Sequence, residues 1–504
     1  MYAVRTISYG LFQYQCEAPV KNPWTRRDVI RAIGAVGVGG SSGSMLRLLG
    51  QAVGQSVDDA SRRPKPSDRK FRSPAVEQLI LEVCAKIADP GLAGLFANCF
   101  PNALDTTVEP GTFEGKPDTV VITGDIPAMW LRDASAQVWP YLGLAAKDDA
   151  LREVLEGVIR RETRCLLIDP YANAFMADLD APPLPWSVHD KTVMKRGVGE
   201  RKYELDSLCY PIRLACGYWK QTGDTQPFDA PWRDAMKLVV ATMRVQQRKH
   251  NPGPYRFQRA SRRVTETLSH DGYGNPVKAV GLIASGFRPS DDACTYPFLV
   301  PSNLFAVTSL RQLAEMAAAI LHDYALANDA QALATEVEAA LPEYATAKRP
   351  GGTIWAYEVD GFGRQLLMDD ANVPSLLALP YLESSPDEQI YERTRAFVWS
   401  EQDPWYFKGS ASEGIGGPHE GANMIWPMSQ IIYALTAGRG PGSGMEIRHM
   451  LTLLQASAAG TGFMHESYSK NNVHKFTRPW FAWANSLFGE LIVRLAATRP
   501  DLLR

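Results

Sequence analysis

The sequence has few cysteines, and none lies in a pattern typical of a metal site or a disulfide framework. Seven are scattered over 504 residues, and no two of them form a CxxC pair. An odd number without close spacing argues against a zinc ribbon and against a small domain held together by disulfides. We therefore expect mostly buried thiols that serve as small apolar side chains.

The chain also lacks a surplus of charge of either sign. Lys and Arg total 53 against 55 for Asp and Glu, a formal net charge of -2. A protein dedicated to nucleic acids usually carries a basic surplus for phosphate binding. We therefore expect no nucleic-acid partner.

Motifs for metal-dependent, nucleotide-dependent and serine-nucleophile chemistry are missing as well. Outside the Gly- and Ser-rich residues 32–50 the chain has no G-x-S-x-G elbow, and it has no Walker loop and no G-x-G-x-x-G after a strand. His419 and His465 are each followed by Glu, as in a zinc-binding helix, but Asn423 and Ser469 stand where the second His belongs. We expect neither a metal nor a cofactor.

Residues 1–73 differ in composition from the rest. Residues 25–31 read TRRDVIR, and the weakly apolar, Gly- and Ser-rich residues 32–50 follow. This pattern resembles a twin-arginine export signal, with a disordered basic arm as the alternative. The apolar stretch is too short and too glycine-rich to span a bilayer. Residues 56–73 predict a flexible linker. We expect a periplasmic or extracellular protein, or a cytoplasmic one if the signal does not function.

Residues 74–504 are predicted to form one catalytic domain built mostly from amphipathic helices. Apolar residues recur at three- and four-residue spacing in roughly a dozen stretches. Good examples lie within residues 76–83, 212–219, 304–320 and 487–495. Short β segments are expected at 119–122 and 353–356. Long connections favour a toroid of paired helices over a regular helical solenoid, which needs shorter loops and clearer repeats.

The predicted loops carry unusual mixtures of acidic, basic and aromatic residues. These loops lie at residues 123–133, 201–207, 286–292, 368–374, 416–419 and 463–468. Any single carboxylate among them has helix capping as an alternative role. Most of these loops come just before an amphipathic stretch, so a toroid can direct their side chains into one shared pocket.

Carboxylates and aromatic rings without a nucleophile motif indicate carbohydrate chemistry. Glycoside hydrolysis needs one protonated carboxyl group for the leaving oxygen and one ionised carboxylate that activates water or attacks the sugar. Charged Asp and Arg side chains make strong hydrogen bonds to sugar hydroxyls.

The region from Pro74 to Val493 resembles glycoside hydrolase family 125, the exo-α-1,6-mannosidases. The strongest signatures are GDIPAMWLRD at 124–133, YELDSLCYP at 203–211, FRPSDD at 287–292, YEVDG at 357–361 and MHES at 464–467. The resemblance implies an all-α fold, an (α/α)6 barrel with short β segments in its loops. It further implies an inverting mechanism, no metal requirement and release of terminal α-1,6-linked mannose.

The same resemblance assigns the catalytic carboxyl groups. Glu466 corresponds to the general base, and the general acid is Asp291 or Asp292. We favour Asp291, with Asp292 raising its pKa or binding a hydroxyl. Arg288 would lower that pKa if its side chain pointed toward the acid, so we expect it to face the sugar instead.

Further residues correspond to family positions around the sugar. Asp125, Trp130, Arg132 and Asp133 resemble those that line the terminal-sugar subsite, where a forked Arg and two Asp can bind hydroxyls. A buried structural ion pair between Arg132 and one of these Asp residues is the alternative.

Tyr203, Asp206 and His419 are expected to make contacts of a second tier. The expected partners are mannose-containing oligosaccharides or glycans. Two alternatives stay open: a related helical-barrel exo-glycosidase with another sugar specificity, and a carbohydrate-binding protein without catalysis. The presence of both candidate carboxylates argues against the second.

Overall fold

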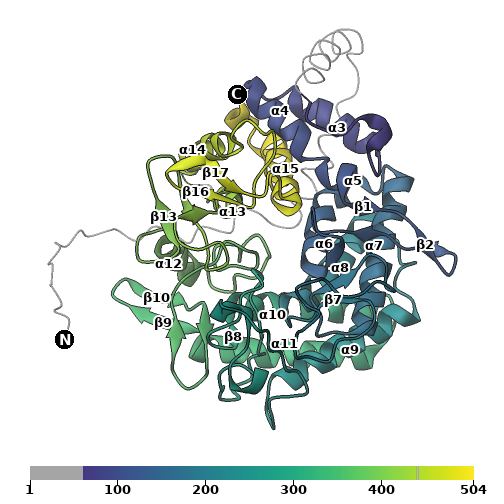
Figure 1. Cartoon of the computed structure of the whole chain (residues 1–504), viewed down its shortest axis with the longest axis vertical. Coiled ribbons are helices and arrows are strands. Elements are labelled where there is room, and N and C mark those ends of the chain that lie inside the picture. Colours follow the sequence, from purple (N-terminus) through teal and green to yellow (C-terminus); the bar gives the residue numbers. More distant parts are fainter. Residues whose placement is uncertain (1–60, 439, 441) are drawn as a thin grey trace.

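The computed structural model describes residues 61–438, 440 and 442–504, so the twin-arginine-like motif lies outside the described residues. The described chain is mainly helical, with short strands (Figure 1). The α-helices are α3 Pro74–Cys84, α4 Pro90–Cys99, α5 Asn102–Thr106, α6 Leu131–Val138, α7 Asp149–Ile168, α8 Asp206–Thr222, α9 Ala230–Gln246, α10 Val300–Ala319, α11 Tyr324–Tyr344, α12 Glu388–Val398, α13 Pro427–Leu435, α14 Ser443–Ser457 and α15 Ala482–Thr498.

The most buried helices are neighbours in a ring. Helix α6 packs between α15 and α8, α8 packs against α10, and α13 packs against α15. All residues of α6 and α13, and nearly all of α15, are buried. A helix that is buried all round belongs in the interior of a large domain. These helices therefore surround the centre of the ring seen in Figure 1.

A second set of helices packs against the first and keeps one polar face. Helix α7 contacts α8 and α9, α11 contacts α9 and α10, and α14 contacts α13. Along the chain, α6, α8, α10 and α13 are each followed by a helix of this second set, which are α7, α9, α11 and α14 respectively. The order is therefore a repeated alternation of buried and half-exposed helices, as the predicted toroid of paired helices requires.

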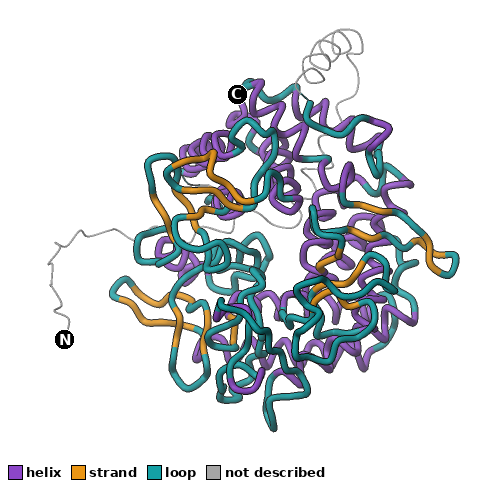
Figure 2. The backbone as a smooth tube through the Cα atoms, viewed as in Figure 1, coloured by secondary structure: helices purple, strands orange, loops and turns teal. Residues whose placement is uncertain are grey.

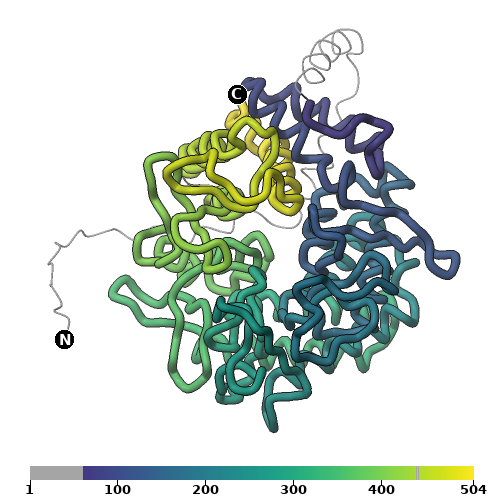
Figure 3. Tube along the Cα trace, viewed as in Figure 1, coloured from purple at the N-terminus to yellow at the C-terminus, as the bar shows by residue number. Residues whose placement is uncertain are grey.

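The two ends of the described chain close the ring. Helices α3, α4 and α5 pack on α15, and the Ala88 amide donates a hydrogen bond to the Leu503 carbonyl (2.8 Å). In Figure 3 the purple N-terminal segment accordingly lies beside the yellow C-terminal helices.

Residues 61–73, predicted to belong to a flexible linker, are instead packed onto the folded body. The Arg63 guanidinium is almost buried and pairs with Glu77 (2.6 Å) and Asp105 (2.7 Å). The amides of Lys70 and Phe71 donate to backbone carbonyls of α5. Composition alone indicated a linker because it does not reveal that two distant carboxylates neutralise this arginine.

One expected pair of helices is irregular. Residues 375–382, between α11 and α12, form buried turns. The Asp369 carboxylate accepts hydrogen bonds from the amides of Leu376 (2.8 Å) and Leu377 (2.9 Å) at their start. Tyr381 then reaches Glu490 of α15 (2.8 Å). The turns thus occupy the place in the chain order where the alternation calls for a buried helix.

The strands are short and antiparallel, and Figure 2 shows them among the loops around the ring. The sheets are β1 (Val108–Glu109) with β4 (Val120–Val121); β2 (Thr112–Phe113) with β3 (Lys116–Pro117); β5 (Ala128–Trp130), β6 (Ala174–Met176) and β7 (Val198–Glu200); β12 (Gln365–Leu366), β11 (Glu358–Val359) and β8 (Phe298–Leu299); β9 (Thr346–Arg349) with β10 (Gly352–Trp355); β13 (Tyr406–Lys408) with β14 (Glu413–Ile415); and β15 (Met424–Ile425), β16 (Ser467–Ser469) and β17 (Asn472–Thr477). The β segments expected at 119–122 and 353–356 correspond to β4 and β10.

The cysteines of the described chain are buried, as expected. Among the described helices, none is long and apolar enough to cross a membrane.

Candidate active site

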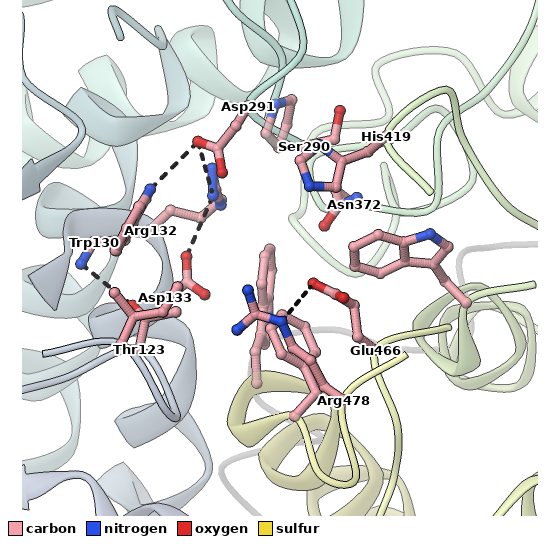
Figure 4. A pocket seen from close by; sticks show the side chains of 15 residues that line it. Thr123, Trp130, Arg132, Asp133, Ser290, Asp291, Asn372, His419, Glu466 and Arg478 are labelled. Atoms are coloured by element: carbon pink, nitrogen blue, oxygen red, sulfur yellow. Dashed lines mark hydrogen bonds and ion pairs between the residues drawn. The ribbon is translucent and has the colours of Figure 1, made fainter. Parts of the chain in front are cut away.

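A pocket of about 420 Å³, counted with its open mouth, lies where the buried helices begin (Figure 4). Trp130, Trp426 and Phe481 line it, and each is the residue immediately before a buried helix, α6, α13 and α15 respectively. The other lining residues are Thr123, Ile126, Arg132, Asp133, Pro289, Ser290, Asp291, Asn372, His419, Glu466, Arg478 and Trp483. Residues far apart in the sequence meet here because the ring brings helix starts together.

Asp291 and Glu466 lie on different sides of this pocket, and their carboxyl groups are directed into it (Figure 4). Asp291 sits in a tight turn in which its amide donates to the Arg288 carbonyl (2.9 Å). Its φ of +66° is in the left-handed region, which Asp tolerates better than most residues. The turn directs Asp291 into the pocket, whereas Asp292 is 1% exposed and does not line it.

Cations and neutral donors surround the Asp291 carboxyl group. Its Oδ1 accepts hydrogen bonds from Trp130 Nε1 (3.3 Å) and Asn173 Nδ2 (2.9 Å), and Arg132 Nη2 lies 3.9 Å away. Lys202 Nζ donates to the Asp291 backbone carbonyl (2.8 Å). Burial opposes ionisation of Asp291, but Arg132 and Lys202 outweigh it and hold its pKa well below the ordinary value.

Glu204 is the partner that keeps a proton beside Asp291. It is wholly buried and pairs with Arg132 Nη1 (2.8 Å), and the Asn173 amide nitrogen contacts both carboxyl groups. Burial raises the pKa of Glu204 well above its ordinary value despite Arg132. The two carboxyls are within hydrogen-bonding reach of each other, and the opposite directions of their pKa shifts favour one proton shared between them.

Glu466 precedes β16 and is nearly buried. Its carboxylate accepts a hydrogen bond from Thr477 Oγ1 (3.2 Å) and pairs with Arg478 Nε (3.3 Å). Burial raises the pKa of Glu466, while Arg478 works in the opposite direction. The result is a carboxylate more basic than an exposed one, as activation of a water molecule requires.

His419 and Asp292 form a further charged pair at the pocket wall. His419 Nδ1 lies 3.6 Å from Asp292 Oδ1. Burial alone lowers the pKa of His419, but Asp292, Asp291 and Glu466 outweigh it and raise the pKa to about 9. His419 therefore carries a positive charge at neutral pH and can donate hydrogen bonds from both ring nitrogens.

Several buried polar atoms around the pocket have no hydrogen-bond partner among the described residues. Among them are Arg132 Nε, Asp133 Oδ2, Asp292 Oδ2, His419 Nδ1 and Trp426 Nε1. Asp133 also lies 3.3 Å from Arg132, and burial raises its pKa to about 6. Buried polar groups are normally paired, so a cluster of unpaired donors and acceptors suits a ligand rich in hydroxyl groups.

The predicted sugar-binding residues are partly assembled in this pocket. Trp130, Arg132, Asp133 and His419 line it. Arg132 is both a lining residue and the buried ion-pair partner that was the alternative. Asp125 is 58% exposed beside the pocket, where it binds Arg478 Nη1 (2.7 Å).

Tyr203 and Asp206 lie behind the pocket wall. Tyr203 is fully buried and packs edge-on against Tyr171 and Tyr255. Asp206 begins α8 and is close to Ser302 (3.5 Å), and burial raises its pKa to about 7. Neither residue is among those that line the pocket.

Arg288 departs from expectation, because it does not face the pocket. Its Nε pairs with Glu358 Oε1 at 2.6 Å, and both side chains are buried. Glu358 also accepts hydrogen bonds from the amides of Thr295 and Tyr296. A guanidinium at this depth needs a carboxylate partner. Arg288 therefore holds the loop that carries Asp291 in place, and the Glu358 carboxylate neutralises its charge.

Other residues of the site were not predicted. Asn372 lies in one of the polar loops noted in the sequence, whereas Arg478 follows β17 with no motif that marks it. Asn173 and Glu204 act from behind the wall through Asp291. Of these four residues, only Glu204 lies within one of the family signatures, the segment at 203–211. The described part of the chain contains no group of three or more His, Cys, Asp and Glu side chains placed to bind a metal.

Two opposed carboxyl groups in a pocket with unpaired hydroxyl-binding groups are characteristic of a glycoside hydrolase. A sequence profile of the metal-independent α-mannosidase family, glycoside hydrolase family 125, matches residues 89–493. The chain therefore belongs to this family, as the sequence motifs indicated, and is an α-mannosidase by class.

Two similar proteins support the assignment. The meiotically up-regulated gene 157 protein of Schizosaccharomyces pombe is 40% identical over 465 residues, which cover 88% of this chain and 90% of the yeast protein. A solved structure of a metal-independent α-mannosidase from Streptococcus pneumoniae, in a non-productive complex with α-1,6-mannobiose, matches with a TM-score of 0.79 and 38% identity. That match covers 85% of this chain and all of the other.

Proposed function

We propose that the protein removes terminal, non-reducing α-1,6-linked mannose by an inverting mechanism, with Glu466 as general base and Asp291 as general acid. The observation that carries this proposal is the position of the two carboxyl groups on different sides of one small pocket. An inverting enzyme needs this arrangement because water must fit between the base and the sugar.

The roles of the two carboxyl groups follow from their surroundings. Burial raises the pKa of Glu466 and Arg478 beside it opposes that rise, so Glu466 is more basic than an exposed carboxylate while a cation still favours its ionised form. Asp291 shares a proton with Glu204, which supplies the acid form that the leaving oxygen requires. Asp292 lies behind the pocket wall, which favours Asp291 over Asp292 as the acid.

In this mechanism the Asp291 carboxyl gives its proton to the glycosidic oxygen as the C1–O bond breaks. Glu466 takes a proton from a water molecule, whose oxygen bonds to C1 from the opposite face. The product is β-mannose, and the proton on Glu466 later returns to solvent. Arg132 and Asp133 bind hydroxyls of the terminal sugar through Arg132 Nε and Asp133 Oδ2, neither of which has a hydrogen-bond partner among the described residues, although Oδ2 is ion-paired with Arg132 Nη2.

The linkage and the exo action have separate support. The linkage is supported by the structure from Streptococcus pneumoniae, which was solved with α-1,6-mannobiose. The exo action is supported by the small size of the pocket, which suits the terminal sugar of a chain. The alternation of buried and half-exposed helices supports an (α/α)6 barrel in which residues 375–382 replace one inner helix. The twin-arginine-like motif supports export of the folded protein, which fractionation of cells expressing the full chain tests.

The test of the function is Glu466→Gln assayed with α-1,6-mannobiose. We expect release of mannose to fall by at least about 10³-fold, because the amide cannot accept the proton from water. The matched control is Glu420→Gln, a neighbouring half-exposed acid that does not line the pocket. Proton NMR of the wild-type reaction should detect β-mannose first. Unchanged turnover of Glu466→Gln, or α-mannose as the first product, refutes the proposal.

A further inference from the structure

Trp186 presents an unusually exposed aromatic surface. The residue is 47% exposed, although tryptophan is normally well buried. Its Nε1 donates a hydrogen bond to Glu200 Oε1 (3.1 Å), and Glu200 is buried. The polar edge of the indole is therefore fixed inward, so the exposed part of the side chain is mainly its hydrocarbon ring.

This tryptophan is connected to Asp291 through two residues. Glu200 Oε2 lies 3.2 Å from Asn173 Nδ2, and the same nitrogen donates to Asp291 Oδ1 at 2.9 Å. Trp186 thus lies on the side of the pocket that carries the general acid. An acid of this kind protonates the oxygen that departs with the leaving group.

Packing also joins the Trp186 loop to the pocket wall. Leu184 is fully buried in a small cluster with Trp130, and Ile126 packs against that cluster. Trp130 and Ile126 both line the pocket. The exposed indole, two residues after Leu184, therefore belongs to a loop whose buried part packs against the pocket wall.

The loop is held rigidly, as a preformed binding surface requires. The Arg259 guanidinium pairs with Asp190 (2.6 Å), Glu200 (2.7 Å) and Glu266 (3.0 Å). The Leu184 amide donates to the Gly199 carbonyl (3.1 Å). Few side-chain rotations remain to be frozen when a ligand binds.

A second exposed apolar residue lies in a segment that contacts His419. Val264 is 84% exposed, and the adjacent Arg263 donates from Nη1 to the His419 carbonyl (3.3 Å). The segment that carries Arg259, Arg263 and Val264 therefore joins the Trp186 loop, at Ser187 and Asp190, to His419, which lines the pocket.

We propose that Trp186 is the platform on which the leaving saccharide stacks, in a subsite for the sugar beyond the cleaved bond. Its ligand is a neutral hexose of a mannose-containing oligosaccharide, whose apolar C–H face packs on the exposed indole. This inference rests on the proposed function, since it uses Asp291 to define the leaving-group side.

The test compares Trp186→Ala with wild type on two substrates. One is α-1,6-mannobiose, and the other is α-mannosyl fluoride, which has no saccharide in the leaving group. We expect kcat/KM for mannobiose to fall about tenfold more than kcat/KM for the fluoride, equivalent to ~1.4 kcal/mol. Trp186→Phe keeps an aromatic face and should recover most of the difference.

The control is Trp219→Ala, a half-exposed tryptophan near the C-terminal end of α8, away from the pocket. This variant should leave both substrates unchanged. Equal effects of Trp186→Ala on the two substrates, or none on either, overturn the platform but leave the catalytic proposal intact. A wild-type protein that hydrolyses neither substrate instead refutes the proposed function and the platform with it.

Discussion

Replacing Arg478 with Met should make Glu466 a stronger base that is protonated at higher pH. Arg478 Nε lies 3.3 Å from Glu466 Oε1 and lowers a pKa that burial raises. An opposite charge at this distance lowers the pKa of a carboxyl group by roughly 1–3 units. Because the Arg478 side chain is 29% exposed, solvent screens its charge, and we expect its removal to raise the pKa of Glu466 by ~1 unit, or about 1.4 kcal/mol.

The measurement is the pH dependence of kcat/KM for α-1,6-mannobiose. Its acidic limb should report Glu466, since the Asp291–Glu204 pair keeps its proton to higher pH. Glu466 must be ionised to act, so Arg478→Met should move this limb up by ~1 pH unit and lower kcat/KM about tenfold on its acidic side.

Two comparisons separate charge from packing. Arg478→Lys keeps a positive charge and should restore most of the shift. Asp125→Asn removes the exposed partner of Arg478 but keeps the guanidinium, so its shift should be much smaller. An acidic limb that stays in place in Arg478→Met, or moves to lower pH, contradicts the assignment of Glu466 as base.

Two further outcomes follow from the same electrostatics. Asp291→Asn should lower kcat/KM for mannobiose about 10²–10⁴-fold but lower kcat/KM for α-mannosyl fluoride far less, because fluoride leaves with little help from an acid. If Asp292→Asn instead shows this difference between the two substrates, Asp292 is the general acid. Burial raises the pKa of Glu162 to about 8, so this side chain is protonated in the folded protein at neutral pH. Below the pKa of the unfolded chain both states are protonated and Glu162 costs no stability, whereas above it the folded state must keep a proton that the unfolded state loses, and the free energy of unfolding falls as pH rises. Glu162→Gln should therefore increase the free energy of unfolding by up to ~3 kcal/mol at pH 7 and by little near pH 4 in urea titrations; equal effects at both pH values would exclude this explanation.

Much of the local structure was predictable because amphipathic helices impose a regular spacing of apolar residues on the sequence. The apolar spacing in residues 76–83 lies within α3, and that in 304–320 follows α10 to its end and one residue beyond. The signature segments also contained both Asp291 and Glu466. Composition gave the wrong answer for residues 61–73, because a linker and a charged segment neutralised by distant partners look the same.

The sequence by itself determined the helical character, the family and a short set of acidic candidates, because periodicity and motifs are local properties. Only the tertiary structure decided which members of that set share a pocket. The turn at Arg288–Asp291 directs Asp291 inward and leaves Asp292 behind the wall, and Glu358 holds Arg288 away from the sugar. The turn is local, but Glu358 is 70 residues from Arg288 in the chain, and such partners meet only when the ring of helices closes.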